Sequence, residues 1–144
     1  RLSLGYPSHA AATDILRGHC MDQIDVVQPV CTAEEFRKMQ QQAAEVFCKD
    51  ELLDYIVRLI EATRGNQWVS QGISPRGSLA LLKMARVHAY MEERDFVSPE
   101  DIHEVFYSVA NHRLMLSTAA KAAGKTEFDV TEQVLSEVPI PRIG

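Results

Sequence analysis

The stretch Gly72-Ile73-Ser74-Pro75-Arg76-Gly77-Ser78 opens the helix that the sequence predicts to be central to the fold. Ser74 is typical of a helix N-cap and Pro75 of a first helical residue, so a helix is predicted from there to about Glu93. Arg76 then lies at the positive end of the helix dipole, where a cation is unfavourable. Only this predicted helix lacks an acid in its first turn. Acids follow the other predicted starts at Thr32, Lys49 and Ser98.

An anion bound at this helix end would make the position of Arg76 favourable, because the free N–H groups, the helix dipole and the guanidinium would all attract the same ligand. Gly77 and Ser78 are small enough to let a ligand approach the backbone, and the Ser78 hydroxyl adds a donor. The alternative is that Arg76 lies along the surface, at a cost of about 0.3 to 1 kcal/mol. The local sequence leaves both interpretations open.

Apolar periodicity on both sides of this stretch predicts an all-α fold, a bundle of five to six helices joined by short connections. Helices are expected from Ser8 to Gly18, from Thr32 to Phe47, from Lys49 to Arg64, from Ser74 to Glu93, from Ser98 to Ala110 and from Asp129 to Glu137. The alanine-rich run 118–126 is predicted to be an exposed loop, and residues 66–72 a connector.

Residues 1–7 have the pattern of a strand followed by a turn. Arg1-Leu2-Ser3-Leu4 alternates as a strand does, and one lone strand is not stable in water. Gly5-Tyr6-Pro7 is typical of a turn. We therefore expect residues 1–7 to be the remnant of a strand and hinge of a missing sheet domain, and residues 8–144 to form the helical domain.

Composition excludes several classes of function. The 144 residues carry a net charge of −5 and no basic block, which disfavours a helix-turn-helix DNA binder or any other nucleic-acid partner. No run approaches the roughly 20 apolar residues of a membrane span. The three cysteines are far apart and the histidines are not paired on a helix face, so neither a zinc site nor a disulfide framework is predicted. A soluble, cytoplasmic protein is the expectation.

A partial phosphate-binding motif occurs at Gly124-Lys125-Thr126, but the first glycine that a Walker A loop requires is replaced by Ala119. No apolar strand precedes it, so the match is interpreted as chance. Without a phosphate loop or a nucleophile–base pair, this chain is not expected to catalyse a reaction alone.

Several motifs together resemble the MoxR family of AAA+ ATPases, and the resemblance spans essentially the whole chain. The matching residues are Gly5-Tyr6-Pro7, Tyr55-Ile56-Val57, Ala62-Thr63-Arg64, Ser74-Pro75-Arg76-Gly77-Ser78-Leu79, Arg94-Asp95-Phe96-Val97-Ser98-Pro99-Glu100-Asp101, His112-Arg113-Leu114 and Val138-Pro139-Ile140-Pro141. Their common order is more specific than any one of them.

The resemblance implies that this chain is the C-terminal helical lid domain of such an ATPase, and that the P-loop core is absent from it. Arg76 would be sensor 2, which reaches the γ-phosphate of ATP, with Ser74, Pro75 and Gly77 beside it. Tyr6 and Pro7 would lie near the hinge and the adenine. ATP and Mg²⁺ would belong to the parent ATPase, and the fragment alone is expected to bind neither.

The resemblance also implies partners. These are the protein's own AAA+ core, neighbouring subunits of a ring that is expected to be a hexamer, and von Willebrand factor A domain proteins, in chaperone-like remodelling or maturation of client proteins. One departure is that His9-Ala10-Ala11-Ala12 stands where the family usually has glutamates. The alternative function is a stand-alone helical protein–protein interaction module in which Arg76 is incidental.

Overall fold

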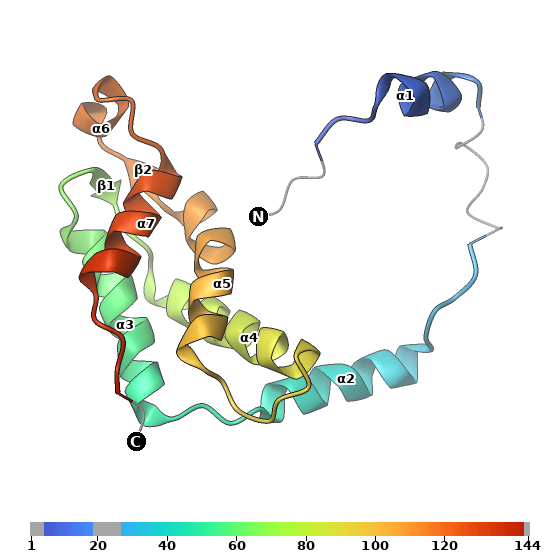
Figure 1. The fold of residues 1–144 in the computed structure, drawn as a ribbon, viewed down its shortest axis with the longest axis horizontal. Coiled ribbons are helices and arrows are strands. Elements are labelled where there is room, and N and C mark those ends of the chain that lie inside the picture. Colours follow the sequence, from blue (N-terminus) through green and yellow to red (C-terminus); the bar gives the residue numbers. More distant parts are fainter. Residues whose placement is uncertain (1–4, 19–26, 143–144) are drawn as a thin grey trace. The chain divides into compact units, whose positions relative to one another are not determined.

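The computed structural model of the chain describes residues 5–18 and 27–142. Its elements, in chain order, are α1 (His9–Leu16), α2 (Ala33–Glu45), α3 (Asp50–Gly65), β1 (Val69–Gln71), α4 (Pro75–Met91), α5 (Pro99–Ala110), a 3-10 turn (Asn111–Arg113), β2 (Met115–Leu116), α6 (Thr118–Ala122) and α7 (Glu127–Glu137) (Figure 1). The all-α prediction is confirmed, with seven α-helices in the described part. The strand predicted at residues 2–4 lies outside the described residues.

The chain divides into two compact units, and the division falls within α2, after Met39. The first unit contains α1, whose N-cap Ser8 accepts a hydrogen bond from the Ala11 amide as its sequence predicts. The capping box predicted between Thr32 and Glu35 is also present. The second unit, which begins at Gln40, holds the helical bundle and all the residues of the core described next.

Helix α5 contacts α4 and α7, and the bundle is closed by helix α3, which contacts the same two helices (Figure 1). The buried residues of α3 recur at helical spacing, at Leu52, Tyr55, Ile56, Leu59, Ile60 and Thr63. Each fully buried Leu or Ile contributes about 1.5 to 3 kcal/mol of transfer free energy. The helix predicted from Lys49 to Arg64 is therefore confirmed, with one buried face.

Helix α4, predicted to be central, packs against both α3 and α5, but only a narrow part of its surface is buried. Its buried residues form one narrow stripe of four-residue spacing, at Gly77, Leu81, Ala85 and Ala89, and three of these are small. Small side chains let α5 approach α4 closely, so α4 needs no wide buried face. Several of its larger apolar side chains, Leu79 and Met91 among them, are exposed.

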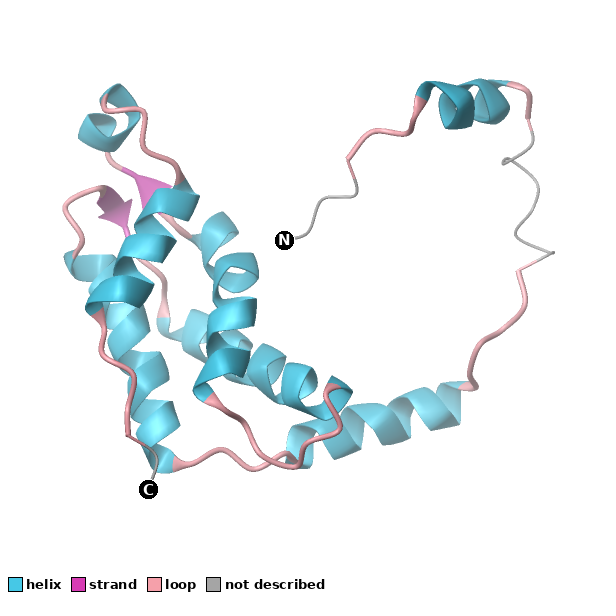
Figure 2. Ribbon diagram, viewed as in Figure 1, coloured by secondary structure: helices cyan, strands magenta, loops and turns pink. Residues whose placement is uncertain are grey.

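Three short elements were not predicted. The connector after α3 contains β1, which pairs with β2 in a two-stranded antiparallel ladder through Val69 and Leu116 (Figure 2). Helix α6 lies in the run predicted to be a loop, because Ser117 caps it and Ala120 is fully buried. Strands of two or three residues and a five-residue helix are too short to give a periodic signal.

The claim that only the Arg76 helix lacks an acid in its first turn is also wrong, since α1 and α6 lack one too. Both are short helices. Among the described helices of eleven or more residues, α4 is still the exception, because α2, α3, α5 and α7 each carry two acids there.

Candidate functional site

The first turn of α4 has the geometry that its sequence predicts. Ser74 has extended N-cap angles (φ −73°, ψ 164°) and Pro75 is the first helical residue. The Ser74 hydroxyl makes no capping hydrogen bond, while its carbonyl accepts from the Gly77 amide at 2.7 Å. Ser74, Pro75 and Arg76 are all exposed. The cap residue thus shapes the turn with its backbone and leaves its side chain available to solvent.

Arg76 lies exposed in this turn. No hydrogen bond or ion pair joins its guanidinium to any residue in the described part of the chain. The whole of α4 contains no aspartate or glutamate, although it carries Arg76, Lys83 and Arg86. In a chain with more acids than bases, this helix therefore offers an uncompensated positive charge at its positive dipole end.

Gly77 has a packing reason for its small size. A Cβ atom placed on it would lie 2.1 Å from Cγ2 of Ile73 and 3.7 Å from Cδ of Arg113. Ile73 is fully buried, so it has little room to move away. Only glycine lets the first turn of α4 pack this closely on the residue before the cap.

The segment that leads into α4 is fastened to the end of α3. The Ile73 amide donates to Oγ1 of Thr63 at 3.1 Å, and the Ile73 carbonyl accepts from Nε of Arg64 at 2.9 Å. Gly72 lies so close to Arg64 that an added Cβ would come within 2.7 Å of its Cγ. Thr63 and Arg64 thus fix the backbone of Ile73, in the segment that leads into α4 and Arg76. Sequence reasoning gave neither residue this role.

A second polar cluster joins the far end of α4 to the start of α5. The Asp101 carboxylate is fully buried, and it accepts hydrogen bonds from Arg94, from Nδ1 of His88 at 2.7 Å and from the Ser98 amide at 2.7 Å. Burial alone would raise the pKa of Asp101, but these hydrogen bonds outweigh it and hold that pKa well below its usual range. Sequence reasoning treated Asp101 only as a capping acid and missed its two side-chain partners.

The remaining candidate residues divide into two groups. Tyr6 and Pro7 are exposed and belong to the unit that ends at residue 39, so their place near an adenine stays a prediction. Gly124-Lys125-Thr126 forms a connector, since Gly124 has a φ of 69° and Thr126 caps α7 through the Asp129 amide. Its likeness to a Walker A motif is therefore a coincidence of turn chemistry, as the sequence indicated.

Two other kinds of feature are absent from the described ranges. No group of three or more His, Cys, Asp or Glu side chains within residues 5–18 and 27–142 is placed to hold a metal ion. None of the helices described is long and apolar enough to cross a membrane.

Comparison with known proteins gives relatives over nearly the whole chain. The chain is 34% identical to the uncharacterised protein YeaC of Bacillus subtilis over 145 aligned residues, which cover 98% of this chain and 44% of YeaC. It is 33% identical to the chaperone MoxR1 of Mycobacterium tuberculosis, with 99% of this chain and 40% of MoxR1 covered. It thus spans about two fifths of the length of these relatives.

A solved structure has the same fold. A crystal structure of a candidate ATPase from Cytophaga hutchinsonii superposes with a TM-score of 0.81 and 27% identity, covering 96% of this chain and 45% of that one. Residues 61–134, about half of the chain, match the AAA lid domain family, and this range includes the end of α3 and all of α4 and α5. The chain therefore belongs to the AAA lid domain family, as the lid region of a MoxR-type AAA+ ATPase.

Proposed function

We propose that Arg76 is the sensor 2 arginine of this ATPase and that it contacts the γ-phosphate of ATP held by a P-loop core domain. The observation that carries the proposal is an exposed guanidinium, without a partner among the described residues, at the positive end of an acid-free helix. A phosphate would be attracted by the guanidinium and by the helix end together. The triphosphate and Mg²⁺ are assigned to the core, and this chain supplies the arginine.

The support of the α4 start fits a sensing role. Thr63 and Arg64 fix Ile73 from one side, and Gly77 packs directly on Ile73 from the other. A movement of Arg76 toward or away from a phosphate would therefore carry α3 and α4 with it as one body. A charge contact that is strong before hydrolysis and weak after it would give this body two preferred orientations.

The decisive experiment replaces Arg76 by alanine in the full-length protein and measures ATP turnover and ATP affinity. We expect turnover to fall tenfold or more, which corresponds to about 1.4 kcal/mol or beyond. Lys83→Ala is the matched control, because Lys83 is another exposed cation of the same acid-free helix. Wild-type turnover in Arg76→Ala would refute the sensor role. An equal loss of turnover in Lys83→Ala would also refute it, because the loss would then be a general effect of removing positive charge from α4. The 144-residue chain alone should bind ATP no better than about millimolar.

For the whole protein, we propose an ATP-driven, chaperone-like remodelling or maturation of client proteins, which rests on the likeness to MoxR1. A ring of subunits, expected to be a hexamer, and partners with von Willebrand factor A domains are part of the same proposal. Sedimentation of the full-length protein with and without ATP tests the ring, and a single-subunit mass in saturating ATP would exclude it.

A further inference from the structure

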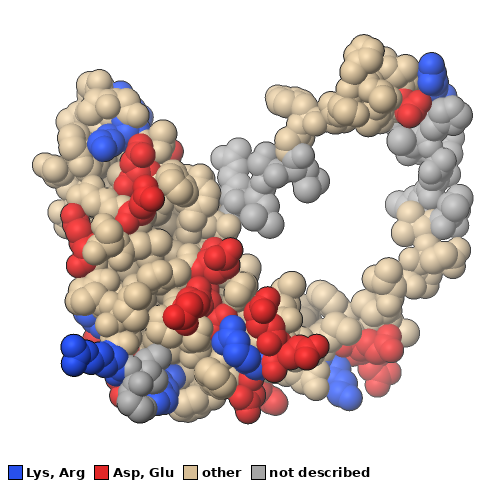
Figure 3. Space-filling view, in the orientation of Figure 1, with Lys and Arg blue, Asp and Glu red and all other residues tan. Residues whose placement is uncertain are grey.

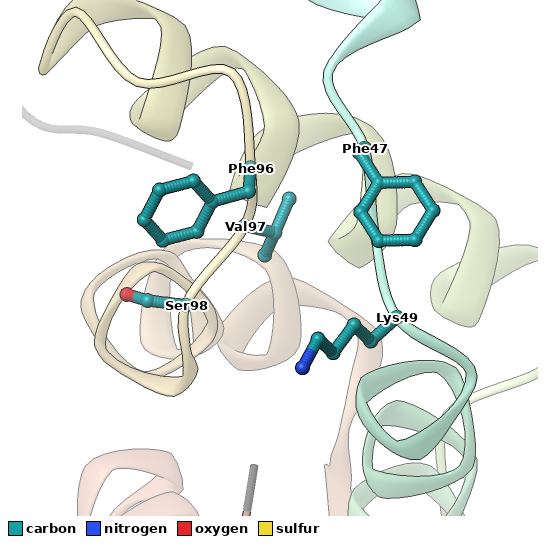
Figure 4. A pocket seen from close by; sticks show the side chains of 5 residues that line it. All are labelled: Phe47, Lys49, Phe96, Val97 and Ser98. Atoms are coloured by element: carbon teal, nitrogen blue, oxygen red, sulfur yellow. The ribbon is translucent and has the colours of Figure 1, made fainter. Parts of the chain in front are cut away.

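An apolar pocket of about 180 Å³ lies between the start of α3 and the turn that joins α4 to α5, away from the α4 start (Figure 4). It is lined by Phe47, Lys49, Phe96, Val97 and Ser98, and nearly all its surface is apolar. An engineered apolar cavity of about 150 Å³ is large enough to bind benzene. The pocket therefore has the size of one bulky apolar side chain.

The walls of the pocket are held in place by the backbone. Phe47 and Phe96 form a parallel bridge in which the Phe47 amide donates to the Asp95 carbonyl and the Val97 amide donates to the Phe47 carbonyl, each at 2.8 Å. The Arg94 guanidinium lies 5.8 Å from the centre of the Phe96 ring and is itself fixed by the buried Asp101. A preformed pocket of this kind loses little conformational freedom when it is filled.

The two phenylalanines that line this pocket are exposed, as are Phe36 and Phe128 elsewhere in the chain. Phe47 is 60% and Phe96 51% accessible to solvent, although they lie side by side on neighbouring segments. Pairs of exposed phenylalanines around a pocket are typical of a surface that another protein covers.

The charge around the pocket is strongly one-sided. The two segments that build it, residues 45–51 and 92–101, hold eight acidic and two basic residues, a net charge of −6 against −5 for the whole chain. All eight acids except Asp101 are exposed, and acidic side chains gather over the α4–α5 turn in the space-filling view (Figure 3). The rest of the chain is therefore close to neutral, and the acidity is concentrated at this one site.

We infer that this pocket is a docking site for a basic polypeptide segment that inserts one bulky apolar side chain, flanked by lysine or arginine, between Phe47 and Phe96. The apolar anchor fills the pocket beside Lys49, and its cationic neighbours meet the exposed acids of the two segments, here called the acidic collar (Glu45, Asp50, Glu51, Glu92, Glu93, Asp95 and Glu100). Complementary charge of this kind mainly sets specificity and association rate, and the anchor supplies affinity. The site is independent of Arg76 and of ATP.

The test uses three capped peptides as probes. The first has one phenylalanine between two pairs of lysines, the second has alanine in place of that phenylalanine, and the third has glutamates in place of the lysines. Each is titrated into the isotope-labelled chain and followed by amide NMR. We expect the first to shift the amides of residues 46–49 and 94–98, the second to bind at least tenfold more weakly, and the third to cause no shifts there.

Variants of the chain test the two halves of the site separately. Phe96→Ala should weaken the first peptide at least tenfold, whereas Phe128→Ala, a phenylalanine of the same 51% exposure on α7, should leave its affinity unchanged. Glu92→Lys should weaken binding, while Glu132→Lys on α7, outside the acidic collar, should not. If Phe96→Ala disturbs the fold, the charge pair still decides the outcome.

The inference is overturned if the lysine and glutamate peptides bind equally well, if the shifts lie elsewhere on the chain, or if the Glu92 and Glu132 variants behave alike. Added salt provides a last check, because binding that depends on the acidic collar must weaken as ionic strength rises.

Discussion

Helices α4 and α5 begin with the same dipeptide, Ser74-Pro75 in one and Ser98-Pro99 in the other, yet their first turns have opposite chemistry. The α5 start is closed, since buried Asp101 binds the Ser98 amide and the side chains of Arg94 and His88. The α4 start has no acid, no side-chain cap and an exposed arginine. The same local signal therefore builds a structural joint at one helix and leaves an open anion-attracting end at the other.

The largest effect on stability is expected from opening the closed start with Asp101→Asn. This change removes the charge that Arg94 and His88 face, and hydrogen bonds to charged groups are worth about 1.5 to 3 kcal/mol each. Because Arg94 and His88 are partly exposed, we expect a total loss of about 2 to 3 kcal/mol in the free energy of unfolding by urea. The exposed Asp95→Asn on the same turn is the control and should change it by less than about 0.5 kcal/mol.

Acid should weaken the same joint. The folded-state pKa of Asp101 is depressed, so its contribution is fully present above the unfolded value of about 3.9 and is lost as pH falls below that value. Urea denaturation between about pH 6 and pH 3 should show stability falling for the wild type, and a shallower fall for Asp101→Asn. Equal slopes would mean that the carboxylate is not held ionised by its partners.

Gly77→Ala tests how tightly the start of α4 is packed against Ile73. The added methyl group would collide with Ile73, at a cost of about 1 to 3 kcal/mol, and the better helix propensity of alanine returns about 1 kcal/mol. We expect a net loss of roughly 1 kcal/mol in thermal or urea unfolding. Gly65→Ala at the end of α3 is the matched control, because nothing lies within 4 Å of its added Cβ, and it should be neutral or stabilising.

Arg76→Asp should have the smallest effect on the fold, and with the opposite sign. An acid in the first turn complements the helix dipole, so the isolated chain should gain about 0.3 to 1 kcal/mol in the free energy of unfolding. Lys83→Asp in the middle of α4 is the control that should give no such gain. A destabilised Arg76→Asp would indicate that the arginine has a structural partner, and the contrast between the two helix starts would fail.

The fold class and most of the helices could be predicted from the sequence because α3, α5 and α7 have buried faces with clear helical spacing. Helix caps such as Ser8 and Thr32 could be predicted because each accepts a hydrogen bond from an amide only three residues further along the chain. The exposed position of Arg76 at a helix start followed from Ser74 and Pro75 in the same way. Features that depend on residues within one turn of each other could therefore be predicted from the sequence.

Interactions between residues far apart in the chain could not be predicted. Ile73 is fastened by Thr63 and Arg64 ten and nine residues away, and the pocket forms because Phe47 meets Phe96 across 49 residues. Several apolar side chains of α4 are exposed, although this helix was predicted to be central, because hydrophobicity alone does not say which side of a helix a neighbour covers. The side of α4 that is buried is decided by the placement of α5, which packs on the small residues of α4.

The β1–β2 ladder has a consequence for the order of folding. It pairs Val69 with Leu116, and Ser117 donates a further backbone hydrogen bond to Trp68 across the same long separation. Such contacts must wait until the intervening chain has compacted, because closing a long loop costs entropy before any hydrogen bond forms. We therefore expect α4 and α5 to pack first as a helical hairpin, and the ladder to close behind them. The region that leads into the open end of α4 would then be among the last parts of the domain to reach its final position.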